Sequence, residues 1–122
     1  LIDAGAHVNA RDGCRGGTPL HHAAGDGHAP VAALLLARGA NAELTSHFGS
    51  TPLMLASEND HAAAVHVLLQ HDAVVDKLSS LQRIPALALA FANRCAHATR
   101  ALLAYGAKPT NVELYPQHKL LA

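Results

Sequence analysis

The chain has 122 residues, a length that fits within one domain. Half of the residues are hydrophobic, but with two Phe, two Tyr and no Trp they favour closely packed short helices over an aromatic-lined ligand pocket. The 9 basic and 9 acidic residues cancel, which excludes a strongly basic surface for nucleic-acid phosphates or anionic lipid.

A four-residue pattern recurs along the chain at a fixed interval. Thr18-Pro19-Leu20-His21 returns as Thr51-Pro52-Leu53-Met54 and, in degraded form, as Ile84-Pro85-Ala86-Leu87, with 33 residues between first members each time. A second marker, a Leu-Leu pair followed by Gly-Ala or Asp-Ala, keeps nearly the same period at 35–40, 68–73 and 102–107. Two independent markers with one period predict a repeat protein.

Each unit of the repeat predicts two short helices. In the first unit, Thr18 is expected to cap a helix that begins at Pro19 and ends at the turn 25–27, and a second helix is expected over 29–38. The corresponding helices of the next two units are expected over 52–58, 62–70, 85–92 and 96–105. The apolar faces of the second helices are expected to carry Val31, Leu34 and Leu35, then Val65, Leu68 and Leu69, then Leu102 and Leu103.

Helices of two turns are too short to be stable alone in water. Each pair must therefore bury its apolar face against the next pair, which predicts a linear stack. The third unit is one residue longer than the second, and we expect the extra residue in the turn around Asn93 and Arg94.

The residues Gly17–Ala24 together with Leu34–Ala40 resemble the ankyrin repeat, and the resemblance extends over nearly the whole chain. It implies an all-α solenoid of stacked helix-turn-helix units with loop fingers shaped like β-hairpins. Residues 1–10 are expected to end a preceding repeat. The expected units that follow are repeats at 11–43 and 44–76, a degenerate repeat at 77–110, and a partial repeat or cap at 111–122.

The resemblance also implies where a partner protein binds, because ankyrin stacks use their fingers and the inner faces of the first helices. The candidate partner-binding residues are Arg11, Arg15, Asp26, Thr45, His47, Phe48, Ser50, Glu58, Asn59, Leu78, Ser80, Leu81, Arg83, Phe91 and Asn93. Phe48 is the preferred anchor, since an exposed aromatic side chain can dominate binding energy. The alternatives are that Phe48 folds back on the neighbouring finger and that Leu78 and Leu81 are simply buried.

The histidines do not predict a metal site. His21 and His22 diverge around a helix, and the spacing of five between His61, His66 and His71 does not place two ligands on one face. In the ankyrin motif the residue at His21 bridges neighbouring backbone groups, so a structural role is expected there.

Other chemistry has little support in the sequence. The loop 12–17 lacks the Lys-Ser/Thr of a phosphate-binding loop, and Cys14 within it has no base to activate it. Cys14 and Cys95 form no CxxC pair, and the apolar run 84–92 is too short to cross a membrane, so an intracellular, cytoplasmic protein is expected. Asn9 resembles the ankyrin asparagine that an asparaginyl hydroxylase modifies, or it merely shapes its turn.

The sequence thus predicts a non-catalytic scaffold that binds another protein, with no cofactor, metal, nucleic acid or membrane partner. The fragment is expected to be monomeric. The alternative is a substrate-recruiting or targeting arm of a larger enzyme or ubiquitin-ligase adaptor, with the chemistry elsewhere. The start at Leu1-Ile2-Asp3, which is no signal peptide, predicts a piece of a longer protein.

Overall fold

A computed structural model describes residues 8–11, 16–80 and 83–108 of the chain. The described residues form six short helices, in agreement with the all-α prediction. They are α1 (Pro19–Gly25), α2 (Ala29–Ala37), α3 (Pro52–Glu58), α4 (Ala62–Gln70), α5 (Ala86–Ala92) and α6 (Ala96–Ala104). None of these helices has the length and apolar character needed to cross a membrane.

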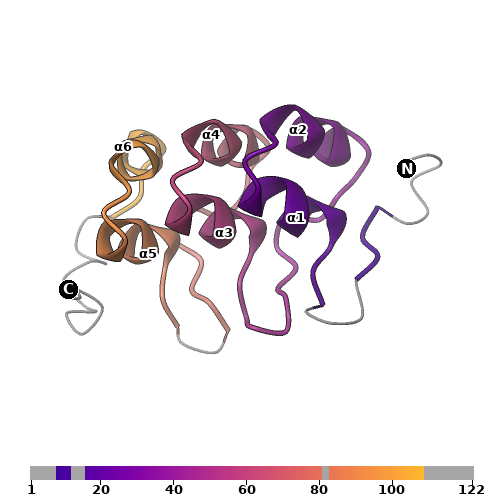
Figure 1. The fold of residues 1–122 in the computed structure, drawn as a ribbon, viewed down its shortest axis with the longest axis horizontal. Helices are drawn as coiled ribbons and strands as arrows, with labels where there is room; N and C mark the ends of the chain where they lie inside the picture. Colours follow the sequence, from indigo (N-terminus) through magenta and orange to yellow (C-terminus); the bar gives the residue numbers. More distant parts are fainter. Residues whose placement is uncertain (1–7, 12–15, 81–82, 109–122) are drawn as a thin grey trace.

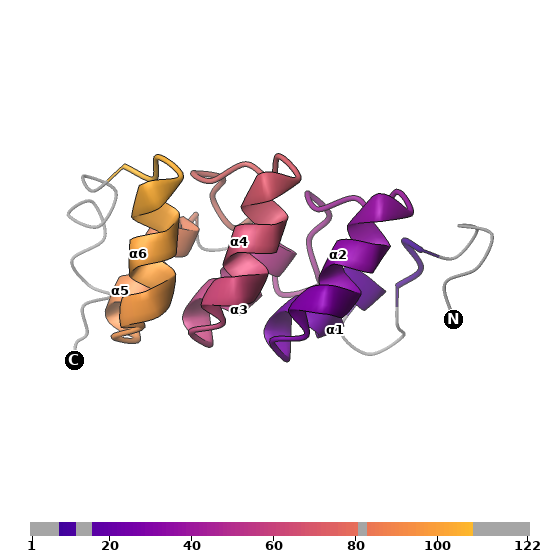
Figure 2. The ribbon, with the colours of Figure 1, turned by 90° about the horizontal axis from the view of Figure 1, so that it is seen from above.

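The helices form two layers that follow the long axis of the molecule. The inner layer holds α1, α3 and α5, and the outer layer holds α2, α4 and α6, with the loop fingers extending from the inner layer (Figure 1). Seen from above, successive helix pairs lie side by side in chain order (Figure 2). Each helix packs on its own partner and on its counterpart in a neighbouring pair. The predicted stack of helix pairs is confirmed.

Two inner helices begin with the same side-chain cap. The Thr18 hydroxyl accepts a hydrogen bond from the His21 N–H, and the His21 ring accepts one from the Thr18 N–H, closing a capping box. Thr51 and Met54 repeat this arrangement in α3, with the methionine sulfur as the acceptor at 3.4 Å. In α5 the N-cap is Pro85, which has no side-chain cap.

The extra residue of the third unit lies in the finger, so its predicted place at Asn93 and Arg94 is wrong. The turn between helices has the same length in both units, because the positive-φ residue follows the end of α3 and of α5 at the same distance. In the finger, by contrast, the Ser46 N–H donates to Ser50 O, while the Ser79 N–H donates to Ile84 O, one residue further along. The longer finger shifts Pro85 from the first helical position to the cap, so α5 starts at Ala86.

The core confirms the predicted faces of α4 but corrects that of α2. Val65 and Leu68 are fully buried, whereas Val31 and Leu34 are 45% and 43% exposed and the buried residues of α2 are Ala32 and Leu35. Val31 is the equivalent in α2 of Ala64 in α4. Ala64 is buried because α2 packs against α4 on that side. Among the described residues no helix covers α2 on that side. In α6, Leu102 is buried as predicted and Leu103 is 42% exposed.

A repeated hydrogen bond ties each unit to the next at the base of the fingers. The three bonds run from Asn41 N–H to Asn9 Oδ1 (2.8 Å), from Val74 N–H to Glu43 Oε2 (3.0 Å) and from Lys108 N–H to Asp76 Oδ1 (3.3 Å). The Asn9 side chain therefore has a structural partner, and its modification by a hydroxylase stays a prediction.

Candidate functional site

The fingers and inner helices enclose a small apolar notch, which is the best-defined candidate site on this face. It has a volume of about 130 Å³ and is lined by Gly17, His21, His22, Ser46, Phe48 and Leu55. Phe48 is 65% exposed, so it does not fold away against a neighbouring finger. The Phe48 N–H donates to Ser46 Oγ at 3.2 Å, which helps to hold the tip of its finger.

The finger that carries Phe48 is braced by the finger before it. Gly16 has φ +69°, and its Cα lies so close to the His47 imidazole that an added Cβ would fall 2.3 Å from the ring. The Arg11 guanidinium donates to Thr45 O at 2.6 Å and to Gly16 O at 3.4 Å. His47 and Arg11 are exposed, as the prediction of a binding role requires, but their contacts also hold the finger next to the notch in position.

Several of the predicted partner-binding residues instead join successive repeats. The bonds are His21 Nε2 to Ser50 O (2.9 Å), Asn59 Nδ2 to Gly25 O (3.1 Å), Asn93 Nδ2 to Glu58 O (3.3 Å) and Ser80 N–H to Gly49 O (3.0 Å). Leu78 is half-buried and forms an isolated bridge with Pro85. The side-chain bonds of Asn59 and Asn93 account for these two residue types without a partner, whereas Ser50 and Ser80 bond through backbone groups.

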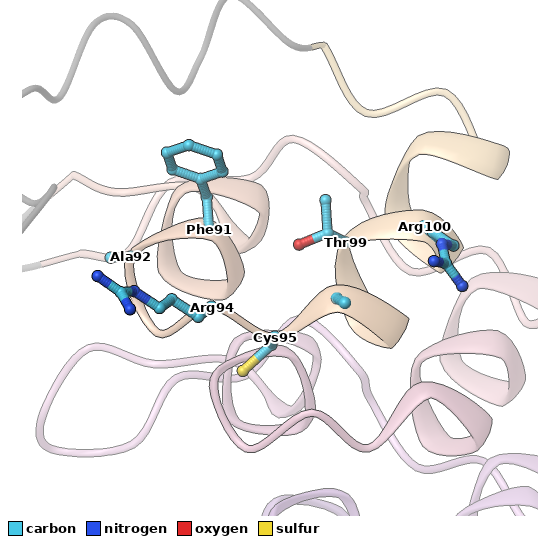
Figure 3. Close-up of a pocket in the computed structure, with 7 residues that line it drawn as sticks. Phe91, Ala92, Arg94, Cys95, Thr99 and Arg100 are labelled. Atoms are coloured by element: carbon cyan, nitrogen blue, oxygen red, sulfur yellow. The ribbon is translucent and has the colours of Figure 1, made fainter.

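The remaining candidates are spread over the molecule. Asp26 is exposed at the end of α1, and Arg83 is exposed in the third finger with φ +60°. Glu58 is half-buried, and burial raises the pKa of its carboxyl. Phe91 belongs to α5 of the last described pair and lines a hollow other than the notch (Figure 3). Arg15 and Leu81 lie outside the described residues.

His21 has the structural role that the motif predicts. The buried ring accepts from the Thr18 N–H at Nδ1 (3.0 Å), and its Nε2 donates to Ser50 O in the next finger. This network requires the neutral ring with the proton on Nε2. Burial lowers the pKa of His21 below its ordinary value of 6.5, and the Arg11 and His22 charges act in the same direction.

The His21 pKa predicts how acid affects stability. Because the unfolded chain takes up this proton at a higher pH than the folded chain, the stabilisation is complete above pH 6.5 and is lost as the pH falls through the lower folded pKa. His21→Met, which copies Met54 of the next repeat, should reduce the drop in melting temperature between about pH 7.5 and about pH 5.5. Thermal melts of both proteins at the two pH values check this, with His71→Met as an exposed control. Equal drops in the wild type and His21→Met would contradict it.

Several other described histidines and Cys95 contact neighbouring groups of the fold. His61 packs on Gly27, His66 meets the Tyr105 ring edge-on at 5.4 Å between centroids, and His71 contacts Val67 O. Within the described part of the chain, no three His, Cys, Asp or Glu side chains lie together as metal ligands would. Cys95 is buried and donates to Glu58 O, and burial raises the pKa of its thiol. Cys14 lies outside the described residues.

The residues that complete the notch carry no signal in the sequence that marks them as site residues. His22, Ser46 and Leu55 come from three different segments, so only the folded stack brings them together. Arg94, Thr99 and Arg100, which line a larger hollow with Phe91, are also absent from the predicted site residues. Comparing equivalent positions of successive repeats would have marked Arg94, which replaces Asp60 and Gly27.

Comparisons with known proteins agree with this architecture. A family model for ankyrin repeats in three copies matches residues 1–79 and 34–113. The chain is 40% identical over 72 residues (58% of the chain) to the putative E3 ubiquitin-protein ligase XBAT34 of Arabidopsis thaliana, of which it covers 19%. It is 45% identical over 69 residues (56%) to the probable E3 ubiquitin-protein ligase XBOS34 of Oryza sativa subsp. japonica, of which it covers 14%.

A mouse relative is similar over a comparable length. The protein fem-1 homolog A-like of Mus musculus is 35% identical over 82 residues (67% of the chain), which cover 12% of that protein. The chain thus spans less than a fifth of the length of each of these relatives. The matched segments, the repeat period and the stacked helix pairs coincide, and the chain therefore belongs to the ankyrin-repeat family.

Proposed function

We propose that this chain is a non-catalytic scaffold that binds another protein through its fingers and inner helices. The observation that supports it is the notch beside Phe48, where an aromatic side chain is left 65% exposed next to a hollow of about 130 Å³. Ankyrin repeats bind other proteins, and leaving a large aromatic ring in water is unfavourable unless a partner covers it. We place the protein inside the cell, acting as a monomer.

The surroundings of the notch favour recognition over catalysis. Its lining combines an exposed ring, the Leu55 side chain and the imidazoles of His21 and His22. Both nitrogens of His21 are engaged by Thr18 and Ser50, so this ring is not available as a general base. The bracing of the finger through Gly16 and Arg11 keeps the notch formed before a partner arrives, which reduces the entropy lost on binding.

Replacing Phe48 with alanine should weaken partner binding by about 2 kcal/mol, or roughly thirtyfold, because a buried aromatic anchor of an interface contributes energy of this size. Helical content should not change, since the side chain is exposed. Partners captured on the immobilised chain would be identified by mass spectrometry and then titrated against both proteins. Val74→Ala, which trims another large exposed side chain (53%), is the matched control. An unchanged affinity for Phe48→Ala would remove Phe48 from the site.

A second candidate function is that the chain is the substrate-recruiting arm of a larger ubiquitin ligase. It is favoured by the names of the plant relatives, which are described as E3 ubiquitin-protein ligases and of which the chain matches only a small part. The parent protein should then ubiquitinate the partner that the chain captures, and Phe48→Ala in the parent should abolish this transfer while leaving self-ubiquitination intact. If the parent protein binds the partner but transfers no ubiquitin to it, the non-catalytic scaffold is the better description of the function.

A further inference from the structure

The last described helix pair carries a hollow that is separate from the notch. It has a volume of about 520 Å³ and is lined by Phe91, Ala92, Arg94, Cys95, Ala96, Thr99 and Arg100. Phe91 and Thr99 lie on the same side of the α5–α6 turn, and the Cys95 thiol points back toward the preceding repeat (Figure 3). The hollow thus lies on the side of the last described pair that corresponds to the contact surface between the earlier pairs. We call this side, around Phe91, Arg94 and Arg100, the end face.

The apolar part of this face differs from the same surface on the earlier pairs. Phe91 stands where α1 has Ala24 and α3 has Ser57. Both smaller residues are completely buried, because the next inner helix packs closely on them, whereas Phe91 is 54% exposed. A ring at this position occupies the space that a further inner helix would need. The face thus differs in shape from the surfaces on which α3 and α5 pack.

The end face also carries a positive side chain where the equivalent surface of the second repeat carries a negative one. In the second repeat Asp60 accepts from the Ala98 N–H at 2.9 Å and contacts His97 at 3.3 Å, so a carboxylate meets the N-terminus of α6. A helix N-terminus carries partial positive charge, which explains the acidic residue. The equivalent residue of the third repeat is Arg94, with φ +58°. A guanidinium there would repel the helix N-terminus of a further repeat.

We propose that this end face binds a segment of another protein in which an apolar side chain is flanked by carboxylates. The apolar group would cover Phe91, which is 54% exposed. The carboxylates would pair with Arg94 and Arg100, neither of which has an ion-pair partner in the described part of the chain. This surface is independent of the notch beside Phe48, so the chain can hold two proteins at once.

The test is a titration of the isotope-labelled chain, followed by nuclear magnetic resonance, with two helical peptides. One peptide carries leucines on one face and glutamates on the other, and its counterpart has lysines in place of the glutamates. The glutamate peptide should shift the amide signals of Phe91, Thr99 and Arg100, and the lysine peptide should not. The variant Arg94→Glu/Arg100→Glu should bind the glutamate peptide about tenfold more weakly, because two attractive pairs become repulsive.

The controls separate this surface from the proposed function. Arg38→Glu makes the same kind of charge change at the C-cap of α2, and Phe48→Ala removes the anchor of the notch; both should leave glutamate-peptide binding unchanged. Thermal melts establish that every variant is folded. Equal binding of both peptides, or full affinity in the double variant, would overturn the proposal. So would signal shifts confined to the notch and lost in Phe48→Ala, or a dimer of the free chain that Phe91→Ala dissociates.

Discussion

Replacing Gly27 with alanine should lower the free energy of unfolding by about 2–4 kcal/mol, a large fraction of the stability of a small domain. Gly27 has φ +78° in the turn between α1 and α2, a conformation that disfavours side chains. A Cβ at this position would also lie 2.6 Å from His61 Nδ1. The expected loss therefore combines backbone strain with a steric clash between two repeats.

Two comparisons separate these contributions. Gly39 has φ +94° and nothing within 4 Å of an added Cβ, so Gly39→Ala should lose only the strain, about 1–2 kcal/mol. His61→Ala should be less harmful in the Gly27→Ala background than in the wild type, since the clash is then absent. Urea unfolding followed by circular dichroism measures the wild type, the three single variants and the Gly27→Ala/His61→Ala double variant. Equal losses for Gly27→Ala and Gly39→Ala would show that the His61 ring simply moves away.

The natural chain supports this argument at the next turn. Asp60 occupies the position of Gly27 with φ +60°, although it has a full side chain. Gly27 faces His61, the N-cap of α4 in the next repeat. The equivalent neighbour of Asp60 is Cys95, the N-cap of α6, and cysteine is smaller than histidine. Asp60 also gains a hydrogen bond from the Ala98 N–H, which lowers the pKa of its carboxyl. A side chain is thus tolerated where its neighbour leaves room and its oxygen caps a helix.

Leu68→Ala should be the most damaging of the single core truncations in α4, with a loss of about 2–5 kcal/mol in the free energy of unfolding. Leu68 is completely buried and lies in the middle of the stack, where helices on both sides hold the walls of the resulting cavity in place. The same leucine-to-alanine change at Leu103, which is 42% exposed, should lose less than about 1 kcal/mol. Urea unfolding of the two variants and the wild type gives the comparison. Similar losses at both positions would mean that Leu103 is also covered in solution.

The repeat period was enough to predict the fold, because each helix pair is specified by the same local signals. Threonine caps, a proline at the first helical position and residues with positive φ recur at the predicted places of the first two repeats. The third repeat was predicted less well, since Ile84-Pro85 was aligned with Thr51-Pro52. A finger can absorb an added residue in its loop, whereas the turn between two helices has a fixed length, and the sequence alone does not show this difference.

The candidate site was predicted only in part. The exposure of Phe48 follows from its place at the tip of a finger, and the structural role of His21 follows from the motif. The notch requires side chains from three segments, and no period in the sequence indicates which of them meet. Ser50 is predicted as a partner-binding residue from its place in a finger and Asn59 from its place on an inner helix, but Ser50 O accepts from the His21 ring and Asn59 Nδ2 donates to Gly25 O of the preceding repeat. Such partners become visible only in the folded chain.

The uncapped start of α5 affects how the stack opens. Thr18 and Thr51 tie the first turns of α1 and α3 with side-chain bonds, while the first turn of α5 is held by backbone bonds from the Ala88 and Leu89 N–H groups to Pro85 O. In a linear array each pair depends only on its neighbours, so an end pair can fray while the others remain folded. Among the three described pairs we therefore expect α5 and α6 to open most easily, which would let the surface around Phe91 adapt its shape while the first two pairs stay folded.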